Sequence, residues 1–284
     1  MASMRDIKRR KGSIQSTQQI TKAMKLVSTV KLQRAKGRAE DSKPYFDAMY
    51  KTVTSVLART TGLDHPYLTG GKTDAVGIIV ITSNRGLAGG YNSNIVKLVK
   101  DSGLDPKTTL IYNIGKKGRE GLTRAGYQIA GDFSDAIEAP AYVDAMTIGK
   151  SALADFAEGK IGSLYLAYTR FKNTVVHEPT LLKLLPVDTE GVEEDTDSKA
   201  VMNFEPEEEE ALELIVPKYV NSLIFGGLTE ALASENGARM QAMDSATSNA
   251  EDMISKLSLQ YNRARQGAIT QELTEIIAGA NAIS

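Results

Sequence analysis

The side chains that most often take part in catalysis are scarce in this sequence. It has no cysteine and two histidines, His65 and His177. A thiol nucleophile and a cysteine-ligated metal are therefore excluded, and two histidines are too few for a metal site built on histidine. The consecutive carboxylates Glu207–Glu210 would point in different directions around a helix start, where they complement the helix dipole instead of converging on a substrate. We expect no catalytic residue, metal site or cofactor in this chain.

A glycine-rich turn is the segment whose composition best suits nucleotide binding. Ser83–Asn92 (SNRGLAGGYN) follows Ala75–Thr82, a short apolar run rich in β-branched residues. The dinucleotide fingerprint needs G-x-G-x-x-G at this place, and the spacing from Gly86 to Gly90 does not match it. The phosphate-loop ending G-K-[ST] occurs at 71–73 and at 149–151, each time without its first glycine. A nucleotide-dependent enzyme is therefore an alternative that depends on the expected fold alone.

The middle of the chain has the periodicity of an α/β domain. Between residues 74 and 188, short apolar runs typical of buried strands alternate with segments of helical spacing. Such alternation predicts a doubly wound, Rossmann-like domain with a largely parallel sheet. The expected strands are Ala75–Thr82, Thr108–Ile114, Tyr127–Ala130, Ser163–Phe171 and Thr174–Leu185, the last as a strand or extended hairpin.

The two ends of the chain predict long helices with narrow apolar stripes. In the C-terminal segment 207–284, apolar and small residues follow one another at alternating steps of three and four, the spacing of a coiled-coil seam. The N-terminal segment 1–60 has a similar stripe, wide enough for one partner helix. We therefore expect a long antiparallel coiled coil of the two ends, with the α/β domain inserted between them. The expected seam residues are Ile20, Met24, Val27, Met243, Ala250, Ile254, Leu257, Ala264 and Ala268.

Charge is distributed unevenly along the chain, although the net charge is −1. Residues 1–39 carry eleven Lys or Arg and one acid, whereas Asp188–Glu213 carries twelve acids and one Lys. The basic end suggests an acidic partner, and one alternative is a coiled-coil adaptor that binds nucleic acid or another acidic surface through this helix. No apolar run approaches the roughly 18 residues needed to cross a bilayer. We expect a cytoplasmic protein that can dock onto a membrane complex.

Four stretches of the sequence carry a recognisable pattern: Ser16–Ser28 (STQQITKAMKLVS), Thr82–Asn92 (TSNRGLAGGYN), the run 238–266 that begins ARMQAM and ends YNRARQ, and Ile269–Ala280 (ITQELTEIIAGA). These stretches resemble the gamma subunit of F-type ATP synthases. They occur in the order expected for that family, and the resemblance extends over essentially the whole chain.

The resemblance implies a function that agrees with the absence of catalytic motifs. The family's gamma subunit is a non-catalytic central stalk, whose coiled coil enters a ring of three alpha and three beta subunits. Its α/β domain lies outside, beside the epsilon subunit and on the membrane rotor ring. Rotation driven by ion flow couples transport to ATP synthesis at the beta subunits. The implied location is the cytoplasmic face of the cell membrane, as a peripheral subunit.

The resemblance also implies contact residues. Arg265, Gln266 and Thr270 match family positions that contact loops of the beta subunit. Lys22 and Lys25 would face acidic parts of the same ring.

Overall fold

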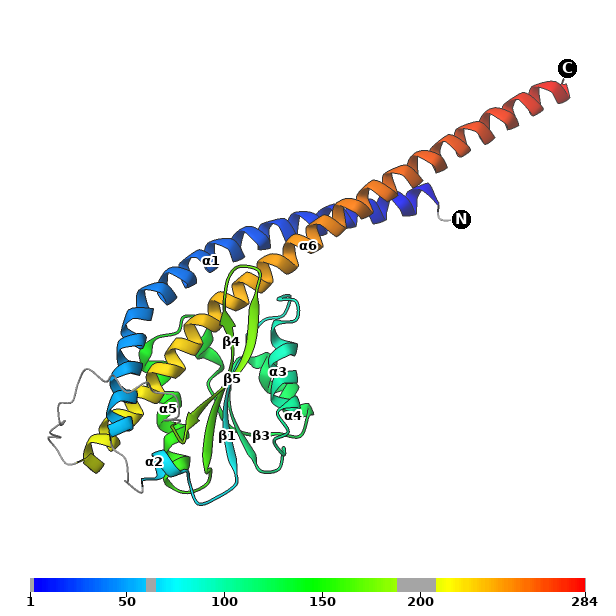
Figure 1. The fold of residues 1–284 in the computed structure, drawn as a ribbon. Helices are drawn as coiled ribbons and strands as arrows, with labels where there is room; N and C mark the ends of the chain where they lie inside the picture. Colours follow the sequence, from blue (N-terminus) through cyan, green and yellow to red (C-terminus); the bar gives the residue numbers. More distant parts are fainter. Residues whose placement is uncertain (1–2, 60–64, 188–207, 284) are drawn as a thin grey trace. The chain divides into compact units, whose positions relative to one another are not determined.

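The computed structural model describes residues 3–59, 65–187 and 208–283. They form two compact units, which we consider separately. The rod consists of Met1–Ser28 and Met240–Ser284, and the α/β domain consists of Thr29–Arg239. Two long helices contribute to both units (Figure 1). These are α1 (Met4–Arg59) and α6 (Glu208–Ile283).

The α/β domain is built on a five-stranded sheet of order β3-β2-β1-β4-β5. Pairing is parallel between β3, β2, β1 and β4, and antiparallel between β4 and β5. The predicted doubly wound, largely parallel sheet is therefore confirmed. Strand order reverses direction between β1 and β4, because β2 and β3 extend the sheet on one side of β1 and β4 and β5 on the other. The strands are β1 (Val76–Ile81), β2 (Thr109–Ile114), β3 (Gln128–Asp132), β4 (Ser163–Phe171) and β5 (His177–Leu185).

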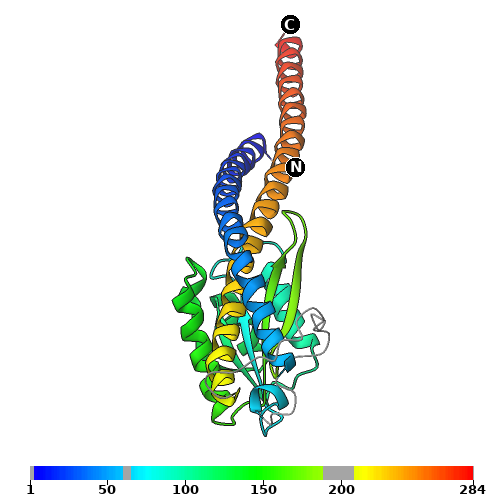
Figure 2. The same cartoon turned by 60° about the vertical axis from the view of Figure 1, so that its left-hand side comes forward.

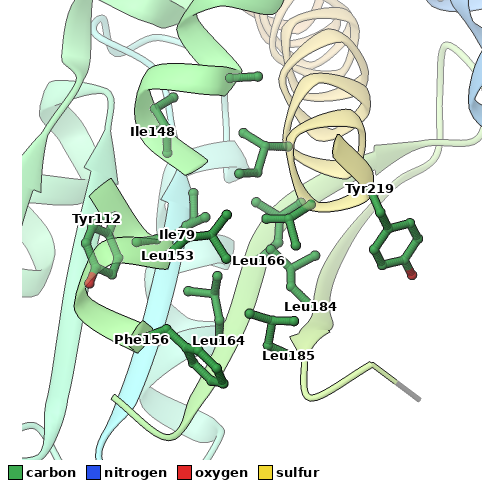
Figure 3. Close-up of a cluster of buried hydrophobic side chains, with 14 of the residues drawn as sticks. Ile79, Tyr112, Ile148, Leu153, Phe156, Leu164, Leu166, Leu184, Leu185 and Tyr219 are labelled. Atoms are coloured by element: carbon green, nitrogen blue, oxygen red, sulfur yellow. The ribbon is translucent and has the colours of Figure 1, made fainter. Parts of the chain in front are cut away.

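Helices cover both faces of this sheet, which explains why β1 is apolar throughout. Every residue of β1 is buried. Val76, Ile78 and Val80 pack on one face with α3 (Tyr91–Asp101) and α4 (Lys116–Arg124). Ile79 and Ile81 pack on the other face with α5 (Tyr142–Ala157) and α6. Figure 3 shows this second core, in which Ile148 of α5 lies near Ile79, and leucines of β4 and β5 lie between Ile148 and Tyr219 of α6. The short elements are α2 (Pro66–Thr69) and a 3₁₀ turn at Ser134–Ile137.

Close packing between α5 and α6 depends on a glycine. A Cβ placed on Gly149 would lie 1.9 Å from Oδ1 of Asn221 on α6. Only a residue without a side chain fits there, because a real Cβ cannot come so close to another atom. Farther along α6, a Cβ on Gly227 would lie 2.9 Å from a methyl group of Leu166 on β4. Helix α6 is thus packed closely against both α5 and the sheet.

By length and composition alone, the stretch Glu210–Asn281 of α6 could cross a membrane, since one 18-residue window reaches a mean hydropathy of 1.2. Half of that window is buried inside the structure. Helices that pack in the core of a protein pass the same test, so the result is weak evidence for a membrane span. The burial of α6 against the sheet accounts for its apolar composition.

Candidate functional site: the rod and the attachment of its helix to the sheet

Three polar contacts define how the two helices of the rod pair. Gln18 Nε2 donates to Glu251 Oε1 at 3.0 Å, and Lys25 Nζ contacts Asp244 Oδ1 at 2.6 Å. Between them, the hydroxyls of Thr21 and Thr247 lie 2.8 Å apart. As residue numbers rise along α1, their partners' numbers fall along α6. The two helices of the rod are therefore antiparallel.

The seam of α1 differs by one residue from the predicted seam. Ile20 and Val27 are 59% and 57% exposed, whereas the neighbouring Thr21 and Ser28 are buried. Thr21 and Ser28 continue the heptad phase of Ile7, which is also buried. The prediction followed the larger apolar side chains, but small residues in the seam let the helices approach closely enough for the hydroxyls of Thr21 and Thr247 to bond. The phase of Ile7, carried forward in steps of seven, was the signal that would have found the correct stripe.

The other predicted seam residues become more exposed toward the C-terminal end of α6. Met243 and Ala250 are buried. Met24 of α1 and Ile254, Leu257 and Ala264 of α6 are half-buried, and Ala268 is exposed. In the register set by the three polar contacts, the partner of Ala268 would lie before the first residue of α1. Ala268 is therefore placed beyond the paired part of the rod.

The end of α6 extends past the first turn of α1 (Figures 1 and 2). Every residue from Arg265 to Asn281 is exposed. This stretch contains the predicted contact residues Arg265, Gln266 and Thr270, of which Thr270 donates its hydroxyl to the carbonyl of Gln266 at 2.9 Å. It also exposes the large apolar side chains Ile269, Leu273, Ile276 and Ile277. An exposed helix with this mixed surface is typical of a segment that another protein covers.

The two predicted contact lysines lie elsewhere on the rod and differ from each other. Lys22 is exposed, while Lys25 is paired with Asp244 of the neighbouring helix. By the register of the rod, Lys22 is level with residue 246 of α6, nineteen residues before Arg265, or roughly 28 Å along the helix. The structure thus places the predicted contacts in two separate zones. Three exposed apolar residues, Ile20, Leu26 and Val27, lie on the same stretch of α1 as Lys22.

In the α/β domain, α6 occupies the place where ligands usually bind. Doubly wound proteins bind ligands at the carboxyl ends of the strands, in the crevice where strand order reverses. Here that point lies between β1 and β4, and β1 stops at Ile81 while β4 continues to Phe171. The exposed edge of β4 is covered by α6: Ser234 donates its hydroxyl to the carbonyl of Thr169 at 3.1 Å, and a Glu230 carboxylate oxygen accepts from the amide of Phe171 at 3.3 Å.

Side-chain hydrogen bonds hold both ends of the glycine-rich turn. The amide of Ser83 donates to Oδ1 of Asn92 at 2.9 Å, and Nδ2 of Asn84 donates to the carbonyl of Ser134 at 2.9 Å. Directly after the turn, the hydroxyl of Tyr91 donates to the carbonyl of Ala231 on α6 at 3.2 Å. Among residues 3–59, 65–187 and 208–283, no group of three acidic or histidine side chains is placed to hold a metal ion.

We call the contacts of Tyr91, Glu230 and Ser234 the anchor contacts, because they attach α6 to the α/β domain. Sequence reasoning missed Glu230 and Ser234. A polar residue on a helix gives no local signal that it will cap the edge of a strand sixty residues earlier. Helix α6 thus contributes its first part to the core of the α/β domain and its last part to the rod.

Comparison with known proteins gives the family. A family model described as ATP synthase matches residues 3–283. The ATP synthase gamma chain of Lachnoclostridium phytofermentans is 65% identical, with both chains covered completely. That of Alkaliphilus metalliredigens is 43% identical, covering 99% of this chain and 98% of the relative. The sodium-ion-specific gamma chain of Acetobacterium woodii is 36% identical, with 99% of each chain covered.

Solved structures agree with this assignment. A chain of the central stalk and c-ring of the Tetrahymena thermophila mitochondrial ATP synthase matches with a TM-score of 0.61 at 25% identity, covering 80% of this chain and 99% of the other. A chain of the Euglena gracilis mitochondrial ATP synthase has the same fold, with a TM-score of 0.72 at 19% identity over 99% of this chain and 94% of the other. This chain belongs to the ATP synthase family and, within it, to the gamma chains.

Proposed function

We propose that this protein is the central rotor stalk of an F-type ATP synthase. In this role the rod turns inside a ring of three alpha and three beta subunits and couples ion flow across the membrane to ATP synthesis or hydrolysis at the beta subunits. The chain itself makes and breaks no covalent bond. It works at the cytoplasmic face of the cell membrane, as a peripheral subunit between the ring and the membrane rotor.

The observation that carries this proposal is the exposed end of the rod. From Arg265 to Asn281 the helix has polar, charged and large apolar side chains on its surface and no covering element in the described part of the chain. A single helix with this surface gains stability when another protein surrounds it. In this family, the partner that would surround the helix is the ring of alpha and beta subunits.

The α/β domain has a further surface that suits a partner. Val143 and Met146 of α5 are exposed at 63% and 47% and line a groove of about 510 Å³ that also includes Tyr67 and Pro217. Exposed apolar side chains around a hollow are typical of protein interfaces. We propose that the domain binds the epsilon subunit and the rotor ring, and that this groove contributes to one of these contacts.

Reconstitution tests the proposal directly. The purified chain should form a stable complex with the alpha and beta subunits of the same organism and should raise their steady-state ATP hydrolysis. A chain that ends at Ala264 keeps the paired part of the rod and should fail to stimulate hydrolysis. Tight, stoichiometric ATP binding by the isolated chain would instead favour an enzyme, and salt-dependent retention on DNA would favour a nucleic-acid adaptor.

A further inference from the structure

Two of the sequence stretches that resemble the gamma family meet in the α/β domain through one arginine. Arg239 is the last residue of the domain, and Met240 is the first residue of α6 in the rod. Nη2 of Arg239 lies 2.7 Å from Oε1 of Glu235, one turn earlier on α6. The same nitrogen donates to the carbonyl of Gly86, in the glycine-rich turn, at 3.4 Å. Arg239 thus links the final turn of α6 in the domain to the loop after β1.

This ion pair differs from the others in the described chain by its burial. The side chains of Arg239 and Glu235 are 12% and 11% exposed, whereas ion pairs such as Lys25–Asp244 and Arg119–Asp132 each have at least one partner that is more than a third exposed. Burial raises the pKa of the Glu235 carboxyl, while the charges of Arg239 and of Lys31 on α1 act in the opposite direction. A pair with so little water around it is poorly screened, and removal of one partner leaves a buried charge alone.

Arg239 is the last residue of α6 in the domain, and its guanidinium bonds that end of the helix to the loop after β1. The anchor contacts of Glu230, Tyr91 and Ser234 all lie earlier on the helix. Without Arg239 the last of the polar contacts named here would be that of Ser234, five residues back, and the helix after it would be held by packing, as at Gly237, where a Cβ would lie 2.5 Å from Nε2 of His177. Torque applied to the rod acts first on the attachment nearest to it.

We propose that Arg239, positioned by Glu235, fixes α6 against rotation within the α/β domain, so that torque passes between the rod and the domain without slippage. Arg239 is a positioning residue, since it acts through the rod and touches no nucleotide. The inference depends on the proposed function and adds to it the residue at which load is transferred.

The experiment uses the assembled synthase in inverted membrane vesicles and compares the wild type with R239Q. ATP hydrolysis is measured with an uncoupler, which removes the load. The ATP-driven membrane potential is measured with an oxonol dye, which responds whichever ion is pumped. Per assembled complex, we expect unloaded hydrolysis to stay within about two-fold of the wild type, and potential-driven ATP synthesis to fall about five-fold or more. The steady membrane potential that R239Q generates from ATP should also be lower than that of the wild type.

Two further variants separate positioning from folding. R239K keeps the charge beside Glu235 but not the planar guanidinium that reaches Gly86, and should give an intermediate loss of coupling. R124Q is the matched control, because Arg124 is an exposed arginine at the end of α4, and it should behave as the wild type. Equal loss of unloaded hydrolysis and of synthesis in R239Q would overturn the proposal, as would wild-type coupling in R239Q. Failure of both R239Q and R239K to assemble would also overturn it, by assigning Arg239 a role in folding.

The role of Arg239 and the proposed function can fail separately, and the experiments distinguish the two failures. If the wild-type chain does not assemble with alpha and beta subunits, the proposed function is wrong. If the wild type assembles and couples normally and R239Q does the same, only the role of Arg239 is wrong.

Discussion

The hydroxyl groups of Thr21 and Thr247 lie 2.8 Å apart in the buried seam of the rod. Each is also close to a carbonyl of its own helix, Thr21 to Gln18 at 3.0 Å and Thr247 to Met243 at 2.7 Å. One hydroxyl can donate across the seam while the other donates within its helix, so both are satisfied. A hydrogen-bonded polar pair in a buried seam favours one register, because a shift along the helices separates the two hydroxyls.

Replacement of one of these threonines should loosen the rod. Thr21→Val removes the cross-seam bond and should lower the local free energy of opening by about 1 kcal/mol. The double variant T21V/T247V should recover part of that loss, because both seam positions are then apolar, while the register becomes less well defined. Amide hydrogen exchange of rod peptides, analysed as a double-mutant cycle, measures both effects. Additive losses in the double variant would show that the two hydroxyls do not interact.

The corrected seam predicts opposite outcomes for two apolar residues of the rod. Met243 is buried, so Met243→Ala should destabilise the rod by about 2 kcal/mol. Ile20 is exposed, and Ile20→Ser should change the stability of the isolated chain by less than about 0.5 kcal/mol. In the reconstituted complex, however, I20S should weaken binding, because Ile20 is a large apolar side chain exposed on the rod. Hydrogen exchange measures the stability of the rod, and complex formation measures binding to the ring. Strong destabilisation of the isolated chain by I20S would show that Ile20 lies in the seam after all.

The close approach at Gly149 should make this position intolerant of a methyl group. Gly149→Ala places a Cβ against Asn221 Oδ1 and should lower the free energy of unfolding by about 1–3 kcal/mol. The double variant G149A/N221A removes the clash and should recover most of the loss. Gly37→Ala is the control, since a Cβ there meets no atom of the described chain within 4 Å. Because Gly37 lies in a helix, G37A should raise the free energy of unfolding by up to about 1 kcal/mol. Urea titration measures the free energy of unfolding of all three variants.

Acidification should destabilise the α/β domain through His177. Its Nε2 is buried without a hydrogen-bond partner among the described residues, and a Cβ on Gly237 of α6 would lie 2.5 Å from it. Burial lowers the pKa of the His177 imidazole below its usual value of 6.5. The unfolded chain therefore binds a proton at a higher pH than the folded chain does, so stability present above pH 6.5 is lost as pH falls through the folded pKa. Urea titrations between pH 5 and 8 should show that His177→Gln loses less unfolding free energy than the wild type as pH falls. If the free energy of unfolding depends on pH equally in the two proteins, this account is wrong.

Removal of the exposed end of the rod should separate assembly from folding. Deletion of Leu273–Ser284 takes away helix that is exposed wherever the structure describes its side chains. The free energy of unfolding of the α/β domain should change by less than about 0.5 kcal/mol, while binding to the ring and ATP synthesis should fall. If the truncation unfolds the whole chain, the division into rod and domain is wrong.

Much of the fold was predictable because the signals were local. The apolar, β-branched run before Ser83 predicted a strand buried on both faces, and β1 has that burial. The failed spacing of the glycine-rich turn predicted that it binds no dinucleotide, a prediction that nucleotide titration still has to test. Heptad steps predicted helices at both ends, and α1 and α6 occupy those segments.

The sequence by itself therefore determined the kinds of element, their order and the family, since periodicity and motif spacing depend on residues close in the chain. Only the tertiary structure decided which stripe of α1 faces α6, because Ile20 and Thr21 differ by one position and burial depends on the partner helix. It also decided that Ser234 and Glu230 would cap β4 and that Arg239 would reach Gly86. Those contacts join residues sixty to one hundred and fifty positions apart, and nothing local to either residue specifies the other.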